Sequence, residues 1–318
     1  MTLHVPLIIR PATSADLPRV RDFAATPSIN TTTLAVLDRN LAIGSYRPEW
    51  MWVAEDGDEI RAVAVWWGPP EWTRPVALDG LFCHPFVDDC TATWTDLLAP
   101  TIRDLPPDAE RPEYHIFLPP DWRGDDEITT ALKGRLEAAA NVGLTDLTER
   151  WRYQWESDQA VPPRSSRLTC APEPDDEVFV DLFARVAVGS LDAATARDVA
   201  RGGVERAARA DLAIYRSMPG ERGWWRIARD AEGQVVGFAI PSANDGGPVV
   251  GYLGVLPEHR GHGYVDDLLA EVTAILHESG ADRIRADTDV GNTPMAAAFE
   301  RAGYAVFAVR LVASEPPT

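Results

Sequence analysis

The chain has 318 residues, with 30 lysines and arginines against 49 acidic residues and a formal net charge of −19. So acidic a chain is a poor partner for nucleic acids and for anionic membrane surfaces, because like charges repel. It contains no signal peptide and no apolar run of membrane length, so we expect a cytoplasmic protein. Its length suits two domains of about 150 residues each.

The cysteines and histidines give no sign of a metal site. Cys83, Cys90 and Cys170 are an odd number without ligand spacing, so we expect them to stay reduced. Arginine outnumbers lysine 29 to one, with Lys133 the single lysine, which is typical of a bacterial coding bias.

The first half of the sequence predicts alternating strands and helices. In chain order these are a strand at 5–10, an amphipathic helix that ends near Phe23, strands at 52–56 and 62–65, a strand that ends in Leu81–Pro85, and a helix that ends near Gly143. A stretch without hydrophobic periodicity then includes a Pro-Pro pair. We therefore predict domains at 1–156 and 168–318, joined by a linker at 157–167.

The second half repeats the same order of elements. An amphipathic run ending at Phe183, strands at 225–228 and 237–240, and Leu253–Pro257 occupy the places of the corresponding first-half segments. Between them lies a long helical stretch, Leu191–Met218. Its acids could attract a polyamine, but we expect them mainly to form surface ion pairs with neighbouring arginines. The acids are Asp192, Asp198, Glu205 and Asp211, and the arginines are Arg197, Arg201 and Arg209.

The stretch from Leu253 to Tyr264 is the most informative part of the chain. An apolar strand runs into a glycine-rich turn and then into an amphipathic helix that Gly280 ends. Gly261 and Gly263 allow backbone N–H groups to converge, and the helix N-terminus and Arg260 add positive charge. The turn therefore predicts an anion site suited to a pyrophosphate.

A second motif follows at a fixed distance. Arg283–Val290 is expected to form a strand, and 292–304 a short helix with Asn292 or Thr293 as its N-cap and Gly303 as its stop. Pro294 fits the first turn of this helix.

Together the two motifs resemble those of the GNAT superfamily of acyl-CoA-dependent N-acyltransferases. The matching residues are Arg260, Gly263, Asn292, Phe299, Glu300, Gly303 and Tyr304. The resemblance implies an α/β (α+β) fold of two tandem GNAT-like domains, each a mixed, mostly antiparallel twisted sheet flanked by helices. It also implies acetyl-CoA as co-substrate, without a metal.

The resemblance assigns the cofactor site residue by residue. The residues expected to bind acetyl-CoA are Leu253, Val255, Arg260, Gly261, His262, Gly263, Tyr264, Val265, Asn292 and Phe299. Backbone groups of Val255 would pair with pantetheine at a strand edge left open where two parallel strands diverge. Two positions depart from the family pattern. Val265 stands where Gly or Ala is usual, and Phe299 where many members have a tyrosine that protonates the departing thiolate.

The chemistry needs a neutral amine and a proton for the thiolate. Asp245, Glu258, Asp287 and Asp289 lie near strand ends and are candidate bases, of which we select Glu258 and Asp289. Because Phe299 cannot donate a proton, we assign the acid to Tyr252. Each of these residues also has a structural interpretation, as a cap, a surface acid or a core tyrosine.

The first half lacks the anion site. Asp88 falls opposite Arg260, and no glycine is near it, so a pyrophosphate would be repelled. We therefore expect a degenerate N-terminal domain that keeps the fold and has lost the cofactor.

We expect an acetyltransferase that acts on a small, cationic, antibiotic-like amine by direct attack in a ternary complex, as a monomer or homodimer. The alternatives are a non-catalytic acyl-CoA sensor, a protein or peptide N-acetyltransferase, and an enzyme like the one that acetylates the cysteinyl precursor of mycothiol, a tandem member with one working half.

Overall fold

The computed structural model describes residues 7–24, 29, 33–106 and 109–316, so residues 5 and 6 of the expected first strand lie outside it. The chain forms two compact units. Unit 1 contains Met1–Glu149 and Val309–Pro316, and unit 2 contains Arg150–Ala308. Within the described residues no helix is long and apolar enough to cross a membrane.

Unit 1 is a mixed sheet with the strand order β1-β2-β3-β4-β5-β12, in which the β4–β5 pair is parallel. Its strands are β1 (Ile8–Pro11), β2 (Met51–Asp56), β3 (Glu59–Trp67), β4 (Ala77–Cys83), β5 (Glu113–Leu118) and β12 (Ala305–Ser314). Its helices are α1 (Leu17–Ala24), α2 (Leu34–Ile43), α3 (Cys90–Arg103) and α4 (Asp126–Asn141), with 3₁₀ turns η1 (Ser14–Asp16), η2 (Pro48–Trp50) and η3 (Trp122–Gly124).

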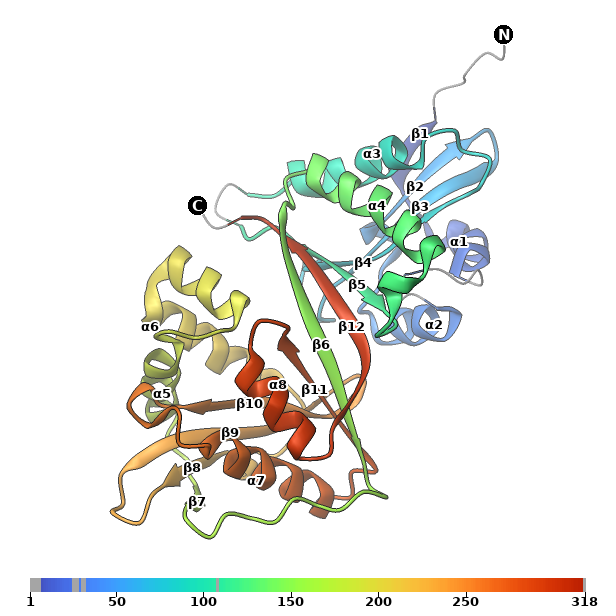
Figure 1. The fold of residues 1–318 in the computed structure, drawn as a ribbon. Helices are drawn as coiled ribbons and strands as arrows, with labels where there is room; N and C mark the ends of the chain where they lie inside the picture. The colour runs from blue at the N-terminus through green and yellow to red at the C-terminus, as the bar shows by residue number, and fades with distance from the viewer. Residues whose placement is uncertain (1–6, 25–28, 30–32, 107–108, 317–318) are drawn as a thin grey trace. The chain divides into compact units, whose positions relative to one another are not determined.

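Unit 2 repeats this plan with the order β7-β8-β9-β10-β11-β6 (Figure 1). Its strands are β6 (Asp146–Glu156), β7 (Thr169–Pro172), β8 (Arg226–Arg229), β9 (Val235–Asn244), β10 (Gly247–Val255) and β11 (Arg283–Asp289). Its helices are α5 (Asp176–Ala187), α6 (Ala193–Ser217), α7 (Tyr264–Glu278) and α8 (Thr293–Arg301), with 3₁₀ turns η4 (Arg222–Trp224) and η5 (Pro257–His259). The mixed, mostly antiparallel sheets with flanking helices confirm the predicted fold class.

The two units exchange their last strands. β12, at the end of the chain, pairs antiparallel with β5 of unit 1, whereas β6, at the end of the first half, pairs antiparallel with β11 of unit 2. The division at residue 156 places β6 in the first domain and β12 in the second, and therefore differs from the observed units at both strands. Periodicity identifies a strand but does not say which sheet it joins.

Two apolar clusters cover the two faces of the unit 2 sheet. Ala239 of β9 belongs to the cluster with α7 and α8, whereas its neighbours Phe238 and Ile240 belong to the cluster with α5 and α6. Successive strand residues point to opposite faces, so each face is covered by one pair of helices. The ends of these helices, on both faces, border the site described below.

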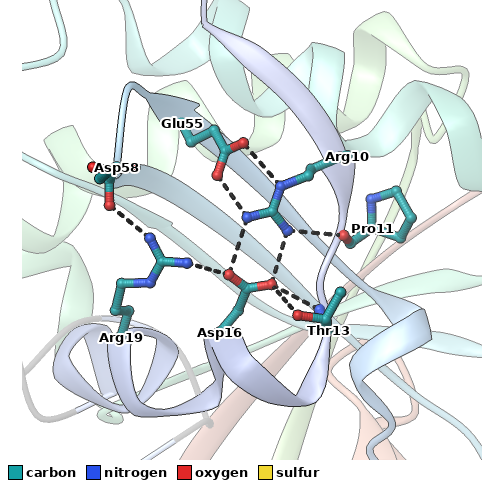
Figure 2. Close-up of polar contacts among 7 residues, drawn as sticks. All are labelled: Arg10, Pro11, Thr13, Asp16, Arg19, Glu55 and Asp58. Atoms are coloured by element: carbon teal, nitrogen blue, oxygen red, sulfur yellow. Dashed lines mark hydrogen bonds and ion pairs between the residues drawn. The ribbon is translucent and has the colours of Figure 1, made fainter.

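A buried carboxylate organises the start of unit 1 (Figure 2). Asp16 is 1% exposed. It accepts hydrogen bonds from Arg10 at 2.8 and 3.0 Å and from the Thr13 backbone N–H and hydroxyl, both at 2.8 Å, and it also pairs with Arg19. Arg10 also donates to Glu55. Its hydrogen bonds to the Asp16 carboxylate are the largest cause that holds the pKa of Asp16 well below the usual value. The network fixes β1 to the turn that begins the first helix.

Unit 1 contains a disulfide bond. Cys83, the last residue of β4, is bonded to Cys90, the first residue of α3, while Cys170 is free. The expectation that all three cysteines stay reduced is therefore wrong for Cys83 and Cys90. Spacing alone did not reveal the pair, because their approach depends on the turn between β4 and α3.

Candidate active site

The site begins where two parallel strands of unit 2 diverge. β10 and β11 pair at Val249 and Arg285, and β10 then continues to Val255. The divergence opens the strand edge that the sequence predicted. A bulge at Gly251 interrupts the β9–β10 register between Val250 and Tyr252. Only glycine fits this bulge, since a Cβ atom there would lie 2.7 Å from the Ile240 carbonyl oxygen.

The turn after β10 presents unpaired backbone donors. Within the described part of the chain, the N–H groups of residues 261–265 donate no hydrogen bond to another backbone or side-chain group. Gly261 and Gly263 have φ values of 80° and 73°, which side chains with a Cβ rarely adopt. Gly263 is the N-cap of α7 and offers no side chain to cap it. The first turn of α7 is therefore free to bind an anion.

Arg260 does not point its charge at this turn. Its Nε donates to the Val255 carbonyl at 3.2 Å, and its Nη atoms donate to the carbonyls of Val186, Val188 and Gly189 at 2.7, 2.9 and 3.1 Å. These bonds engage one carbonyl in the last turn of α5, that of Val186, and the carbonyls of the two residues that begin the following loop. Arg260 thus connects the glycine-rich turn to the loop after α5, and this corrects our expectation of a cation directed at phosphate. It also leaves the Val255 carbonyl only one lone pair for pantetheine.

A cavity of about 630 Å³ extends from the turn between β10 and α7 to the loop between α5 and α6. All but one of the residues predicted to bind the cofactor line it. They are Leu253, Val255, Arg260, Gly261, Gly263, Tyr264, Val265, Asn292 and Phe299. His262 is not among the lining residues. Asn292 also caps α8, accepting from the Met295 N–H at 3.4 Å, as the second motif predicted.

The three residues predicted to be catalytic do not lie in one site. Tyr252 lines the cavity, whereas Asp289 and Glu258 are not among its lining residues. Asp289 is buried, accepts from the Ala193 N–H at 2.6 Å and lies 3.1 Å from Arg150. Glu258 is exposed and pairs with Arg185 at 2.5 Å; its own backbone N–H and Arg185 lower its pKa. Asp289 and Glu258 are therefore better described as a buried acid that accepts from a backbone N–H and as a surface acid than as general bases.

Tyr252 stands in an aromatic group. Its ring stacks on that of Tyr215 at 5.4 Å, and Phe183 and Phe238 lie at 5.1 and 4.9 Å. Tyr215 donates its hydroxyl to the Gly251 carbonyl at 3.3 Å. Burial raises the pKa of Tyr252 well above its usual value, so it stays a neutral phenol at physiological pH. Phe299 is buried and stacks on Tyr153 at 4.9 Å, so the Phe299 position supplies no acid.

The opposite wall of the cavity is acidic. Asp192, Asp198 and Asp211 line it, and all three come from α6 or its N-cap. α6 breaks at Gly203, where φ is 77° and ψ is 164°. On an unbroken helix Asp198 and Asp211 would lie about 20 Å apart on nearly opposite faces. The break brings both to one cavity, which the sequence reading of Leu191–Met218 did not foresee.

Asp211 differs from the other acids of the wall. Asp192 caps α6 at the Thr195 N–H and pairs with Arg150 at 3.1 Å. Asp211 has no hydrogen bond or ion pair to any described residue. Burial, together with Asp198 and Asp192, raises the pKa of Asp211 to about 7. This side chain is therefore ready to exchange a proton near neutral pH.

Sequence reasoning missed two further residues of the site. Arg150, in β6, lines the cavity and joins Asp192 to Asp289. Arg167, placed in the predicted linker, lies over the Tyr264 ring at 4.7 Å and donates to the His262 carbonyl, in the glycine-rich turn, at 2.9 Å. Both residues contact partners that are distant in the sequence, so no local pattern indicated that they belong to the site.

Comparison with known proteins agrees with this geometry. Residues 194–304 match the acetyltransferase (GNAT) family. A 78-residue segment is 35% identical to a protein named mycothiol acetyltransferase from Clavibacter sepedonicus, and it covers 24% of this chain and 26% of that protein. The match thus spans about a quarter of the relative's length.

Solved structures share the fold of the whole chain. A GCN5-related N-acetyltransferase from Sphaerobacter thermophilus is 18% identical, with a TM-score of 0.62 over 96% of this chain and 94% of that one. A tandem GNAT protein from the clavulanic acid biosynthesis pathway is 19% identical, with a TM-score of 0.54 over 98% and 99% of the two chains. The match to the acetyltransferase (GNAT) family thus covers the part of unit 2 that contains both the glycine-rich turn after β10 and the second motif.

Proposed function

We propose that unit 2 transfers an acetyl group from acetyl-CoA to the primary amine of a small, cationic molecule, by direct attack in a ternary complex. One observation carries the proposal. A single cavity joins a turn of unpaired N–H groups, suited to a pyrophosphate, to an acidic wall suited to an ammonium group. Proximity of the two substrates in one cavity is the requirement for direct attack.

The acetyl-CoA end is supported by the chain's own donors. Gly261, Gly263, Tyr264 and Val265 line the cavity at the N-terminus of α7, and their unpaired N–H groups would bind the phosphates. Arg167 lies beside Gly263 with its side chain half exposed, and it pairs with Asp267 at 2.5 Å. The open edge of β10, with Leu253 and Val255, would pair with the pantetheine amides as a neighbouring strand would.

The acceptor end is supported by its charge. Four acids line the cavity, Asp192, Asp198, Asp211 and Asp287, against the arginines Arg150 and Arg260. Arg260 is taken up by backbone carbonyls and Arg150 by Asp192 and Asp289. A cationic, antibiotic-like amine therefore fits better than an anionic acceptor.

In the transfer, the amine nitrogen forms a bond to the thioester carbonyl carbon, and the carbon–sulfur bond breaks. The leaving thiolate takes a proton from the neutral hydroxyl of Tyr252, and the second proton on the nitrogen replaces it. Tyr252 lines the cavity beside the Gly251 bulge, at the divergence of the strands.

We assign unit 1 to a scaffold without a cofactor. Its turn after β4 holds Asp89, whose carboxylate caps α3 by accepting from the Ala92 N–H at 2.9 Å. Arg135 donates to the Leu81 carbonyl at 3.1 Å, and the Trp94 indole donates to the Phe82 carbonyl at 3.0 Å. The strand groups that would meet pantetheine, and the helix end that would meet phosphate, are therefore already bonded within unit 1.

Acylation of the mycothiol precursor is the second candidate, favoured by the 35% identity to a mycothiol acetyltransferase over 78 residues. The two candidates share the acyl donor and differ in the acceptor.

Calorimetry with acetyl-CoA and thiol release across a panel of acceptors test the proposal. The panel contains aminoglycosides, polyamines, the mycothiol precursor and short peptides. We expect one acetyl-CoA per chain and turnover with a small amine. Absence of acetyl-CoA binding would contradict the proposal, binding without turnover would favour a sensor, and turnover of peptides alone would favour a protein acetyltransferase.

A further inference from the structure

Asp211 occupies a particular place on the acidic wall. It lies one helical turn before Tyr215 on the second half of α6, and both residues line the cavity. The Tyr215 ring stacks on Tyr252, the phenol at the divergence of β10 and β11. Residues four apart share a helix face, so Asp211 and the aromatic pair bound the same region of the cavity.

The other charged groups of this region are already engaged. From α6, Asp192 pairs with Arg150; from β11, Asp287 lies 3.3 Å from Arg152. Arg260 donates to carbonyls around the loop after α5. The remaining titratable neighbours of Asp211 are Asp198, Tyr215 and Tyr252, which supply no positive charge. The Asp211 carboxylate thus faces the cavity with no cation to neutralise it among the described residues.

We propose that Asp211 is the general base that removes a proton from the ammonium group of the acceptor. This assignment rests on the proposed function, since it presumes an amine in the cavity. Asp211 is partly buried, and removing an unpaired carboxylate from water is costly, so a substrate ammonium group is the cation that would offset that cost.

The proton transfer completes the reaction already described. The ionised Asp211 takes one proton from the R–NH₃⁺ group and leaves a neutral amine with its lone pair free. That nitrogen forms the C–N bond, the C–S bond breaks, and the nitrogen's second proton reaches the thiolate through Tyr252. Asp211 then returns its proton to solvent, so the balance is one ammonium and one thioester giving one amide, one thiol and one H⁺.

The electrostatics suit this role. Burial, Asp198 and Asp192 raise the pKa of Asp211 to about 7, so near pH 7 it is both ionised in part and basic enough to accept a proton. Below this pH the protonated carboxyl neither attracts nor deprotonates an ammonium group. The rate is therefore expected to fall on the acid side of neutrality.

Asp211→Asn tests the assignment, with Glu205→Gln as matched control. Glu205 is an exposed acid of the same helix, outside the cavity, and pairs with Arg209. For the amine that turns over best, we expect Asp211→Asn to lower kcat/KM about 100-fold, the usual range for a general base. The acid limb of the pH profile should also disappear, while acetyl-CoA affinity by calorimetry stays within about threefold.

The outcomes separate the two levels of inference. Asp211→Asn with near-normal turnover and an unchanged acid limb would overturn the role of Asp211 alone. A wild-type protein that binds no acetyl-CoA, or acetylates no amine, would overturn the proposed function instead. A large loss in Glu205→Gln as well would assign the effect to the charge of α6 in general and would also overturn the specific role of Asp211.

Discussion

Corresponding helix ends in the two units have opposite chemistry. In unit 1 the helix after β4 is capped by its own carboxylate, Asp89, and a disulfide from Cys83 to Cys90 ties down the turn that precedes it. In unit 2 the helix after β10 begins at Gly263, has no side-chain cap and follows a turn of unpaired N–H groups. The same topology therefore makes either a helix start capped by the chain's own carboxylate or one with N–H groups left open to an external anion.

The largest expected effect comes from giving unit 2 the self-capped end of unit 1. Gly263→Asp introduces a carboxylate at the N-cap, where the pyrophosphate would bind, and should weaken acetyl-CoA binding about 100-fold, or nearly 3 kcal/mol. Gly263→Asn is the matched control, because Asn tolerates the positive φ equally well and carries no charge. Calorimetry should give a loss below about fivefold for Asn. Equal losses for both variants would show that backbone strain, not charge, sets the effect.

The second prediction tests the closure of unit 1. Arg135 is buried, lies 4.6 Å over Trp94 and bonds the Leu81 carbonyl, so Arg135→Leu should lower the free energy of unfolding by about 2–3 kcal/mol. Denaturant titration measures this loss. Arg103→Leu, an exposed change on α3, should cost less than about 1 kcal/mol. A second acetyl-CoA bound per chain, either in the wild type or after Arg135→Leu, would contradict the view of unit 1 as a closed copy.

The disulfide gives a third, smaller effect. Cys83 and Cys90 are separated by 7 positions, and losing the bond through Cys83→Ser should lower the free energy of unfolding by about 2 kcal/mol. Thermal unfolding should show the loss, and acetyl-CoA affinity should not change. Cys170→Ser, which removes the free half-buried thiol, serves as the control. An effect of Cys83→Ser on acetyl-CoA binding would mean that the units are not functionally separate.

The fourth prediction compares the buried, paired carboxyl of Asp16 with the partly buried, unpaired carboxyl of Asp211. Asp16 is paired with arginines and its pKa is lowered, so its stabilisation is present above pH 3.8 and is lost as acid protonates it (Figure 2). Asp211 is unpaired and its pKa is raised from 3.8 to about 7, so the folded protein should lose stability as the pH rises through this range. Asp211→Asn should then stabilise the ligand-free protein by about 1–2 kcal/mol at pH 8, after allowance for partial exposure, and not at pH 4. Thermal unfolding at the two pH values measures it, and a gain that is equal at both would contradict the raised pKa.

The sequence predicted the features that depend on local signals. The turn after β10 follows from Gly261 and Gly263, and the α8 N-cap from Asn292, because each conformation is set within a few residues. The engagement of Arg260 by carbonyls more than 60 positions away has no such signal. The break in α6 is an intermediate case, because it has a local signal that was not decisive. Gly202 and Gly203 stand together in the sequence, but the helical periodicity favoured one continuous helix. Asp211 could be identified as a residue of the site only once the break was known, because the break brings Asp211 and Asp198 to one cavity.

The exchange of β6 and β12 has a consequence for synthesis of the protein. The sheet of unit 1 needs residues 309–313, which are synthesised after residues 150–308 of unit 2, to cover the edge of β5. Until then that edge presents unpaired backbone groups, a surface prone to pair with other chains. Unit 1, although encoded first, can therefore complete its fold only after all of unit 2 has been made. A nascent chain stalled before residue 309 would be an aggregation hazard in spite of carrying most of unit 1.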